Sequence, residues 1–188
     1  MSRLSSRNPE SSAELKAVYE EITRSRGWVS NAMASLSHAP EGLRRFAAVG
    51  DYVRYHTDLT EVQRELAIVS IGRAVPYAAT HHAVLAVQAG VPEAAVQDIL
   101  RDKVPTVLAP ADTALVRYVL AFGSPGSVDA ATFAGLKSHF SERAITDITL
   151  VAAYYLALGT TLNALQVELE APEARDVEVR WQKAQMKG

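Results

Sequence analysis

The spacing of the apolar residues constrains this chain most, because almost every segment carries the 3.6-residue period of an α-helix. In the first such segment, Leu15, Val18, Tyr19 and Ile22 form one stripe, and Gly27 follows its end as a helix-terminating residue does. The alternation typical of a half-buried strand does not replace this period in any segment. We therefore predict an all-α fold.

Residues that start or stop helices divide the chain into the expected elements. Thr60-Glu61-Val62-Gln63 has the form of a capping box, with a hydroxyl at the N-cap and Gln three residues later. Pro76 opens a helix that Gly90 closes. Six helices are expected in the first part of the chain: one that begins at Ser12, and others at Asn31 to Leu36, Pro40 to about His56, Thr60 to about Arg73, Pro76 to Ala89 and Pro92 to about Arg101. Two more helices are expected after N-caps at Asp112 and Asp129. The last helix is expected to extend from Ser141 towards Glu170, with a break at Gly159.

The connections between these helices predict one domain of antiparallel helix hairpins over residues 1–188. The clearest loop, at residues 123–126, is too short for a domain linker. We expect the packed core at about 12–170 and a polar tail at 171–188, in which Trp181 is the only large apolar residue.

Composition excludes several classes of function. The 188 residues are 48% hydrophobic and 21% charged, and a formal net charge of −2 gives no electrostatic footprint for nucleic acid or an anionic membrane. They contain no cysteine, so a disulfide, a thiolate metal site or a thiol nucleophile cannot come from them.

Residues 1–30 lack the apolar core of a signal peptide. The most apolar run, Ile148 to Leu158, has only about ten residues, so we expect a cytoplasmic protein without a membrane span.

Glu65 is the first unusual residue, because it shares a helical stripe with apolar residues. An ionised carboxylate on such a face costs several kcal/mol unless it is paired or hydrogen-bonded. One interpretation is a structural acid that pairs with an arginine such as Arg73 or Arg101. The other is an acid that takes part in chemistry.

Two adjacent histidines on the Pro76 helix are the second unusual feature. His82 lies on a face of apolar and small residues, whereas His81 shares a side with Tyr77. A lone inward histidine is more often a satisfied core residue than a catalyst. Two adjacent histidines beside Tyr77 raise the weight of a functional interpretation.

The hairpin geometry brings Glu65 and His82 together. The turn is centred near Ala74 and Val75, with Glu65 about nine residues before it and His82 about eight after it. At 1.5 Å rise per residue, the two lie at similar heights on antiparallel helices, within roughly 3 Å. A glutamate that faces a histidine holds its tautomer and suits it to general acid or base catalysis. A purely structural hydrogen bond would have the same geometry.

A metal site and the common cofactor motifs receive little support. His81 and His82 point about 100° apart on a helix, and the remaining histidines, His38, His56 and His139, show no ligand spacing. No glycine-rich nucleotide motif or serine-hydrolase elbow is present, so we predict no cofactor and no metal. Tyr154 and Tyr155 lie in the late apolar helix, where we expect core packing.

Several short segments in consistent order resemble the carboxymuconolactone decarboxylase family. They are Leu59-Thr60, Arg64-Glu65-Leu66-Ala67-Ile68, Tyr77-x₃-His81-His82 and Ala86-x₃-Gly90-Val91-Pro92, together with residues 29–40 upstream and residues 147–150 and 163–165 downstream. The resemblance covers about residues 12 to 170. It implies an alkylhydroperoxidase D-like helical fold, assembled as a trimer or hexamer with pockets near the subunit contacts.

The resemblance also matches Glu65 and His82 to the acid and the histidine of the family's active region. The peroxidase branch has a Cys-x-x-Cys just before that histidine, but here residues 76–80 contain no sulfur, so thiol peroxidase activity is excluded. Two departures put the substrate in question. The connection from Glu65 to His82 is about two residues shorter than in the family, and Ala79 replaces an expected aromatic residue.

The leading hypothesis is a cofactor-independent lyase that decarboxylates a small lactone or an activated keto acid. His82 would donate the proton, Glu65 would hold His82, and Tyr77 or His81 would bind the substrate. Alternatives are an isomerase or dehydratase with the same pair, a non-catalytic oligomeric ligand-binding protein and, more remotely, redox chemistry through a bound metal. The expected partners are a small-molecule substrate and further copies of the chain.

Overall fold

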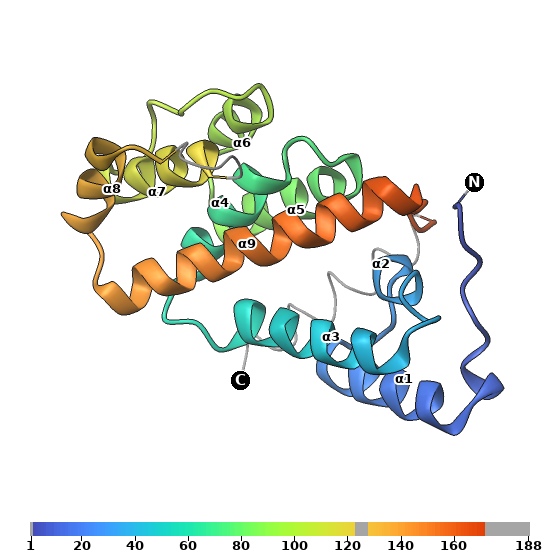
Figure 1. Ribbon diagram of the computed structural model, residues 1–188. Helices are drawn as coiled ribbons and strands as arrows, with labels where there is room; N and C mark the ends of the chain where they lie inside the picture. The colour runs from blue at the N-terminus through green and yellow to red at the C-terminus, as the bar shows by residue number, and fades with distance from the viewer. Residues whose placement is uncertain (1, 123–127, 172–188) are drawn as a thin grey trace. The chain divides into compact units, whose positions relative to one another are not determined.

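The computed structural model describes residues 2–122 and 128–171, and these residues form helices and no strand (Figure 1). The all-α prediction is therefore confirmed for the described residues. The elements are η1 (Pro9–Ser11), α1 (Ala13–Arg26), α2 (Asn31–Ala34), α3 (Pro40–Tyr55), α4 (Glu61–Gly72), α5 (Pro76–Ala89), α6 (Glu93–Leu100), α7 (Pro110–Ala121), α8 (Ala130–Lys137) and α9 (Glu142–Leu165).

The chain divides into two compact units. Unit 1 comprises residues 1–51 and 161–188, and unit 2 comprises residues 52–160. The single domain expected over the whole chain stays a prediction. The predicted loop at residues 123–126 and the tail with Trp181 lie outside the described residues.

Unit 1 is built on the helix predicted from the first apolar stripe. Ser12 caps α1 by accepting a hydrogen bond from the Leu15 N–H, and Gly27 ends it with the left-handed φ of 81° that glycine tolerates. Leu15, Val18 and Ile22 are buried as predicted. The Arg26 guanidinium then joins α1 to α3 through the Asp51 carboxylate and the Ala47 carbonyl, each 2.8 Å away.

Unit 2 contains α4 to α8 and most of α9, and α4 is its central helix. The Thr60–Gln63 capping box is present, with both reciprocal hydrogen bonds formed. Every residue of α4 from Glu65 to Gly72 is buried, because α5, α6 and α7 all pack on this helix. The predicted hairpin of α4 and α5 is therefore present.

Three expected helix boundaries were wrong. The helix assigned to an Asp112 N-cap begins at Pro110, where the fixed φ of proline suits the first helical turn, and Asp112 lies inside that turn. The helix expected over Asn31 to Leu36 ends at Ala34. The last helix ends at Leu165 instead of continuing towards Glu170.

The break expected at Gly159 is also absent, and α9 runs through this position without interruption (Figure 1). The glycine serves a close approach instead. A Cβ atom built on Gly159 would lie 2.6 Å from Cγ2 of Val75, the N-cap residue of α5. Only a residue without a side chain fits at this crossing.

Among the described residues, α9 is the one helix that is long and apolar enough to cross a membrane by length and composition, with 24 residues. The apolar run from Ile148 to Leu158 that was considered for a membrane span covers only part of this helix. Core helices of folded proteins have the same properties. In unit 2, Ile148 and Val151 on α9 are fully buried, and Thr149 shares a 2.8 Å hydrogen bond with Tyr118 of α7.

A buried carboxylate on α9 holds the segment that leads into α4. The Asp147 side chain is fully buried and accepts hydrogen bonds from the Tyr52 hydroxyl at 2.6 Å, the Asp58 backbone N–H at 2.9 Å and the Arg143 Nε at 3.1 Å. Arg143 also donates to the Tyr52 hydroxyl. Because Asp58 precedes the Thr60 cap by two residues, this network fixes the start of the helix that carries Glu65.

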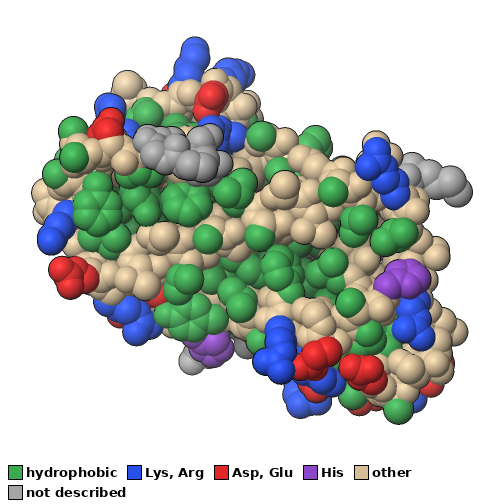
Figure 2. Space-filling view, in the orientation of Figure 1, with side chains coloured by type: hydrophobic (Ala, Val, Ile, Leu, Met, Phe, Trp, Pro, Cys, Tyr) green, Lys and Arg blue, Asp and Glu red, His purple; other side chains and the backbone are tan. Residues whose placement is uncertain are grey.

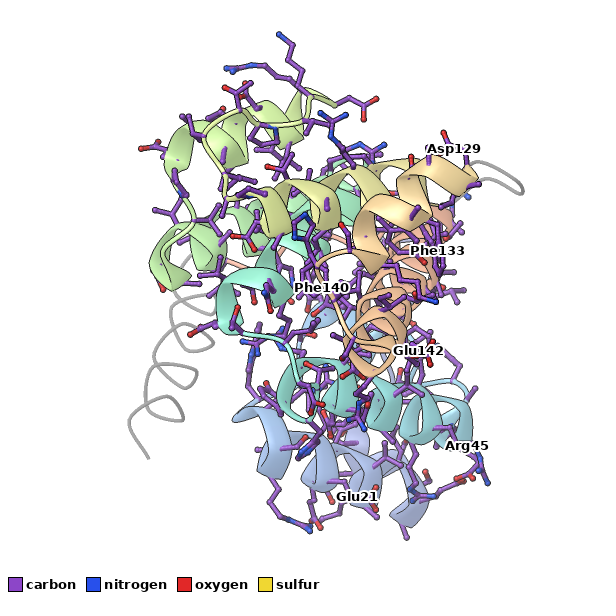
Figure 3. All side chains as sticks on the ribbon, turned by 90° about the vertical axis from the view of Figure 1, so that its left-hand side faces the viewer. Glu21, Arg45, Asp129, Phe133, Phe140 and Glu142 are labelled. Atoms are coloured by element: carbon purple, nitrogen blue, oxygen red, sulfur yellow. The ribbon has the colours of Figure 1, made fainter. Side chains whose placement is uncertain are left out.

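Unit 2 also exposes hydrophobic side chains near α7 and α8 (Figure 2). Phe133 on α8, labelled in Figure 3 one turn after the Asp129 cap, is 42% exposed and its ring centroid lies 6.4 Å from that of Tyr118. The Asp129 side chain accepts a 2.7 Å hydrogen bond from the Thr132 N–H, which confirms this predicted cap.

Candidate functional site

Glu65 and His82 form a buried pair between α4 and α5. The His82 Nδ1 lies 2.9 Å from the Glu65 Oε2, and the two side chains are only 6% and 3% exposed. The contact predicted from the register of the hairpin is therefore present. The hydrogen bond to Glu65 selects the tautomer of neutral His82 that carries its proton on Nδ1.

Small residues at the end of the hairpin allow this pairing. A Cβ atom on Gly72 would lie 2.9 Å from the Cβ of Ala78, so α4 and α5 approach each other closely beside their connection. Pro76 occupies the first turn of α5, where its missing N–H costs nothing. Further along the two helices, Glu65 and His82 lie within hydrogen-bond distance of each other.

Two arginines complete the electrostatic surroundings of Glu65. The buried Arg54, in the last turn of α3, contributes its positive charge, and the Arg64 Nε lies 4.0 Å from the Glu65 Oε1. Burial by itself would raise the pKa of Glu65. The charge and hydrogen bond of His82, together with the two arginine charges, outweigh burial and lower this pKa below its usual value. Glu65 is therefore ionised at neutral pH.

The arginine partners expected for a structural Glu65 were wrong. Arg73 binds the Asp102 carboxylate at 2.6 Å and the Ser70 carbonyl at 2.7 Å, and Arg101 is exposed after α6. Arg54 was missed altogether. No spacing in the sequence distinguishes this arginine from a solvated one at the end of a helix, and only the structure shows that it is buried.

The other side of His82 faces α9. The ring of Tyr155 meets His82 edge-on, with centroids 5.0 Å apart and an interplanar angle of 86°. Tyr155 is buried, as expected of a core aromatic residue, but its contact with His82 was not predicted. Within residues 2–122 and 128–171, Nε2 of His82 has no hydrogen-bond partner. Nε2 is therefore the nitrogen that can exchange a proton with a bound molecule.

Tyr77 and His81 form a separate pair on α5. Their rings stack with centroids 4.8 Å apart and an interplanar angle of 15°, and both residues are half-buried. The structure thus distinguishes the two histidines, because His82 contacts Glu65 and His81 contacts Tyr77. The substrate-binding role of Tyr77 and His81 stays a prediction.

The described part of the chain contains no group of three or more His, Cys, Asp or Glu side chains that could hold a metal ion. His82 and Glu65 supply only two such groups at the site. A buried, ionised carboxylate bound to a histidine with one free ring nitrogen is instead an arrangement for proton transfer.

Comparisons with solved structures identify the fold. An uncharacterized peroxidase-related protein of Ralstonia eutropha JMP134 with an alkylhydroperoxidase AhpD core is 19% identical, with 90% of this chain and 92% of that chain covered and a TM-score of 0.75. A peroxidase-related protein of Silicibacter sp. TM1040 is 18% identical, with 90% and 92% coverage and a TM-score of 0.74. The debrominase Bmp8 is 20% identical, with 92% and 96% coverage and a TM-score of 0.71. At these identities the similarity establishes the fold alone.

A sequence comparison finds a match to one family over part of the chain. No curated protein matches the chain. The sequence profile of the carboxymuconolactone decarboxylase family matches residues 40–121, which include α3 to α7 and therefore Glu65 and His82. Over these residues the chain is similar to the carboxymuconolactone decarboxylase family, and its described residues have the AhpD-like fold, while its 188 residues contain no cysteine.

Proposed function

We propose that the protein is a cofactor-independent lyase that decarboxylates a small lactone or an activated keto acid. The observation that carries the proposal is the buried 2.9 Å pair of Glu65 and His82, in which Nε2 of His82 has no partner among the described residues. The family match is consistent with this reaction. Without a cysteine in the sequence, the chain offers no thiol for a peroxidase reaction.

The reaction needs three contributions from the protein. When the bond between the substrate and its carboxylate breaks, the electron pair moves into a conjugated carbonyl and gives an enolate. His82, protonated and held by Glu65, donates the Nε2 proton to the enolate and completes the product. The buried surroundings strengthen every electrostatic interaction with the developing charge. The stacked rings of Tyr77 and His81 would bind the substrate from α5.

Two other functions are compatible with the pair. An isomerase or dehydratase would use the same proton transfer on a related substrate. A non-catalytic ligand-binding protein would keep Glu65 and His82 as a structural pair, and the high burial of both side chains favours this alternative over an exposed site. An enzyme and a ligand-binding protein differ in whether a substrate is turned over. Stability measurements do not report turnover.

The test is an ultraviolet assay with 4-carboxymuconolactone at neutral pH, applied to wild type, His82→Ala and Glu65→Gln. We expect turnover by wild type and a loss of at least about a hundredfold in each variant, as for general acid–base groups. His56→Ala, which changes an exposed histidine outside the Glu65–His82 pair, is the matched control and should keep full activity. If both site variants keep full activity on a confirmed substrate, the assigned roles are wrong.

The remaining expectations belong to this proposal. We propose a homo-oligomer, as a trimer or hexamer, that acts on a small molecule in the cytoplasm and binds neither nucleic acid nor a membrane. Light scattering of the purified protein tests the oligomer, and fractionation of cells that express the chain tests the location.

A further inference from the structure

In unit 2, α9 exposes a helix face that carries no charge. No acidic or basic residue follows Asp147 on this helix. Leu150 is 40% exposed and Leu156 is 36% exposed. At 3.6 residues per turn, these leucines and three further exposed residues lie within about 60° of one line along the helix. We call these five residues the α9 stripe: Thr146, Leu150, Ala153, Leu156 and Thr160.

The exposed face of a helix in a soluble protein is normally polar. In this chain α1 follows that rule, because the residues that it exposes are mostly charged: Glu14, Lys16, Glu20, Glu21 and Arg24. The α9 stripe exposes leucine, alanine and threonine instead. A continuous apolar surface of this kind marks a place where another surface binds.

The two threonines of the stripe do not need water to satisfy their hydroxyl groups. The Thr146 hydroxyl donates to the Glu142 carbonyl at 2.8 Å, and the Thr160 hydroxyl donates to the Leu156 carbonyl. Each threonine thus binds the carbonyl four residues earlier on its own helix. A partner can therefore cover both ends of the stripe without leaving a hydroxyl donor unpaired.

The order of residues in the stripe is the same when it is read in either direction from Ala153. Thr146 and Thr160 lie seven residues from Ala153, and Leu150 and Leu156 lie three residues from it. When two α9 helices cross antiparallel at Ala153, threonine therefore lies beside threonine and leucine beside leucine. A twofold contact pairs one surface with itself, so this order fits a second copy of the chain. Alanine at the crossing also lets two helices approach closely.

We propose that the α9 stripe is a twofold interface between two copies of this chain, in which the α9 helices cross antiparallel at Ala153. The inference rests on the homo-oligomer of the proposed function and names one of its surfaces, but it does not depend on the reaction. A hexamer with threefold and twofold axes contains such a contact, whereas a trimer does not. A helix that lies on a membrane typically carries several lysines and arginines, but α9 has only Arg143.

The test uses engineered cysteines, since the chain has none of its own. On the twofold axis, the two copies of position 153 come within the Cα distance of about 4.4–6.8 Å that a disulfide spans. Oxidation with copper phenanthroline should therefore convert Ala153→Cys to a covalent dimer on a non-reducing gel. Arg45→Cys, at a position on α3 whose native side chain is 81% exposed, measures cross-linking by random collision and should stay largely monomeric.

The matched control within the stripe is Thr146→Cys. At 1.5 Å rise per residue, the two copies of position 146 lie about 21 Å apart in the antiparallel pair, too far for a disulfide. This variant should not cross-link by itself, but its mixture with Thr160→Cys should. Self-cross-linking of Thr146→Cys as strong as that of Ala153→Cys would mean parallel pairing and would overturn the proposed arrangement.

Light scattering of the double variant Leu150→Glu/Leu156→Glu tests the stripe without a covalent bond. Because both leucines are exposed, we expect wild-type helix content by circular dichroism and loss of the twofold contact, from dimer to monomer or from hexamer to trimer. An unchanged oligomer would overturn the inference.

The wild-type protein provides further outcomes that decide the inference. A trimer or a monomer, or cross-linking of Ala153→Cys no stronger than that of Arg45→Cys, would overturn it. A wild-type monomer that sediments with phosphatidylglycerol vesicles would assign the stripe to a membrane instead. The predicted cross-links in a protein that turns over no lactone would support the interface and count only against the proposed reaction.

Discussion

The buried Glu65–His82 pair makes a quantitative prediction about stability. Replacing His82 with Ala removes the hydrogen bond at 2.9 Å and leaves the Glu65 carboxylate, 2% exposed, without its nearest partner. Breaking a buried ion pair from one side costs about 3–5 kcal/mol. Arg54 and Arg64 still offset part of the stranded charge, so we expect the lower end of this range. A loss of about 3 kcal/mol lowers the Tm of a chain of this size by roughly 6–12 °C.

A double-mutant cycle separates this cost from the loss of packing. Once Glu65 is changed to Gln, removal of His82 no longer strands a buried charge. The double variant Glu65→Gln/His82→Ala should therefore be more stable than the sum of the two single effects implies, by more than about 1 kcal/mol. Urea unfolding at pH 7 measures all four corners of the cycle, and His56→Ala, at an exposed position, serves as the control.

Two results would refute a stabilising contact between Glu65 and His82. If His82→Ala unfolds at the wild-type urea concentration, the pair does not contribute as the geometry requires. If the two effects add to within about 0.5 kcal/mol, the residues are energetically independent despite their contact. Either result would remove the physical basis for Glu65 holding His82.

Two further predictions concern the loss of stability at acidic pH and the packing around Gly159. Burial raises the pKa values of Glu65 and Asp147, but their partners outweigh it and lower both below the unfolded values of about 4.3 and 3.9. The stability that they contribute is therefore complete above about pH 5 and is lost as the pH falls through the folded-state pKa values. Urea unfolding between pH 3 and 7 should show a weaker acid dependence in Glu65→Gln and Asp147→Asn than in wild type. Gly159→Ala places a Cβ 2.6 Å from Cγ2 of Val75, and overpacking of about 1–3 kcal/mol exceeds the helix-propensity gain of about 1 kcal/mol. In a Val75→Ala background the same change should become stabilising, and an unchanged sign in thermal melts would contradict the close approach.

Much of the local structure follows from the sequence because the signals for it are short-range. The period of Leu15, Val18 and Ile22 defines a buried helix stripe, and Thr60 with Gln63 specifies where α4 begins. Because the connection after α4 is short, the next helix folds back antiparallel to α4. The height of His82 opposite Glu65 is then a matter of rise per residue, which explains why this contact was predictable.

Other features depend on helices that are distant in sequence. Arg54 and Tyr155 act on Glu65 and His82 from positions outside the hairpin, and neither residue stands out by spacing or composition. Gly159 was expected to break its helix, since an isolated glycine lowers helix propensity. The helix continues through Gly159 instead, and the glycine is needed because α9 passes so close to Val75 that no side chain fits at position 159.

The sequence by itself therefore determined the helical class, most helix ends, the absence of thiol chemistry and the one pair that lies across a tight hairpin. Only the tertiary structure decided which charges surround that pair and which histidine belongs to it. The physical reason is the range of the interactions. Hydrogen bonds along a helix and across a short turn are set by neighbouring residues, whereas burial and pairing of a side chain depend on every element that packs against it.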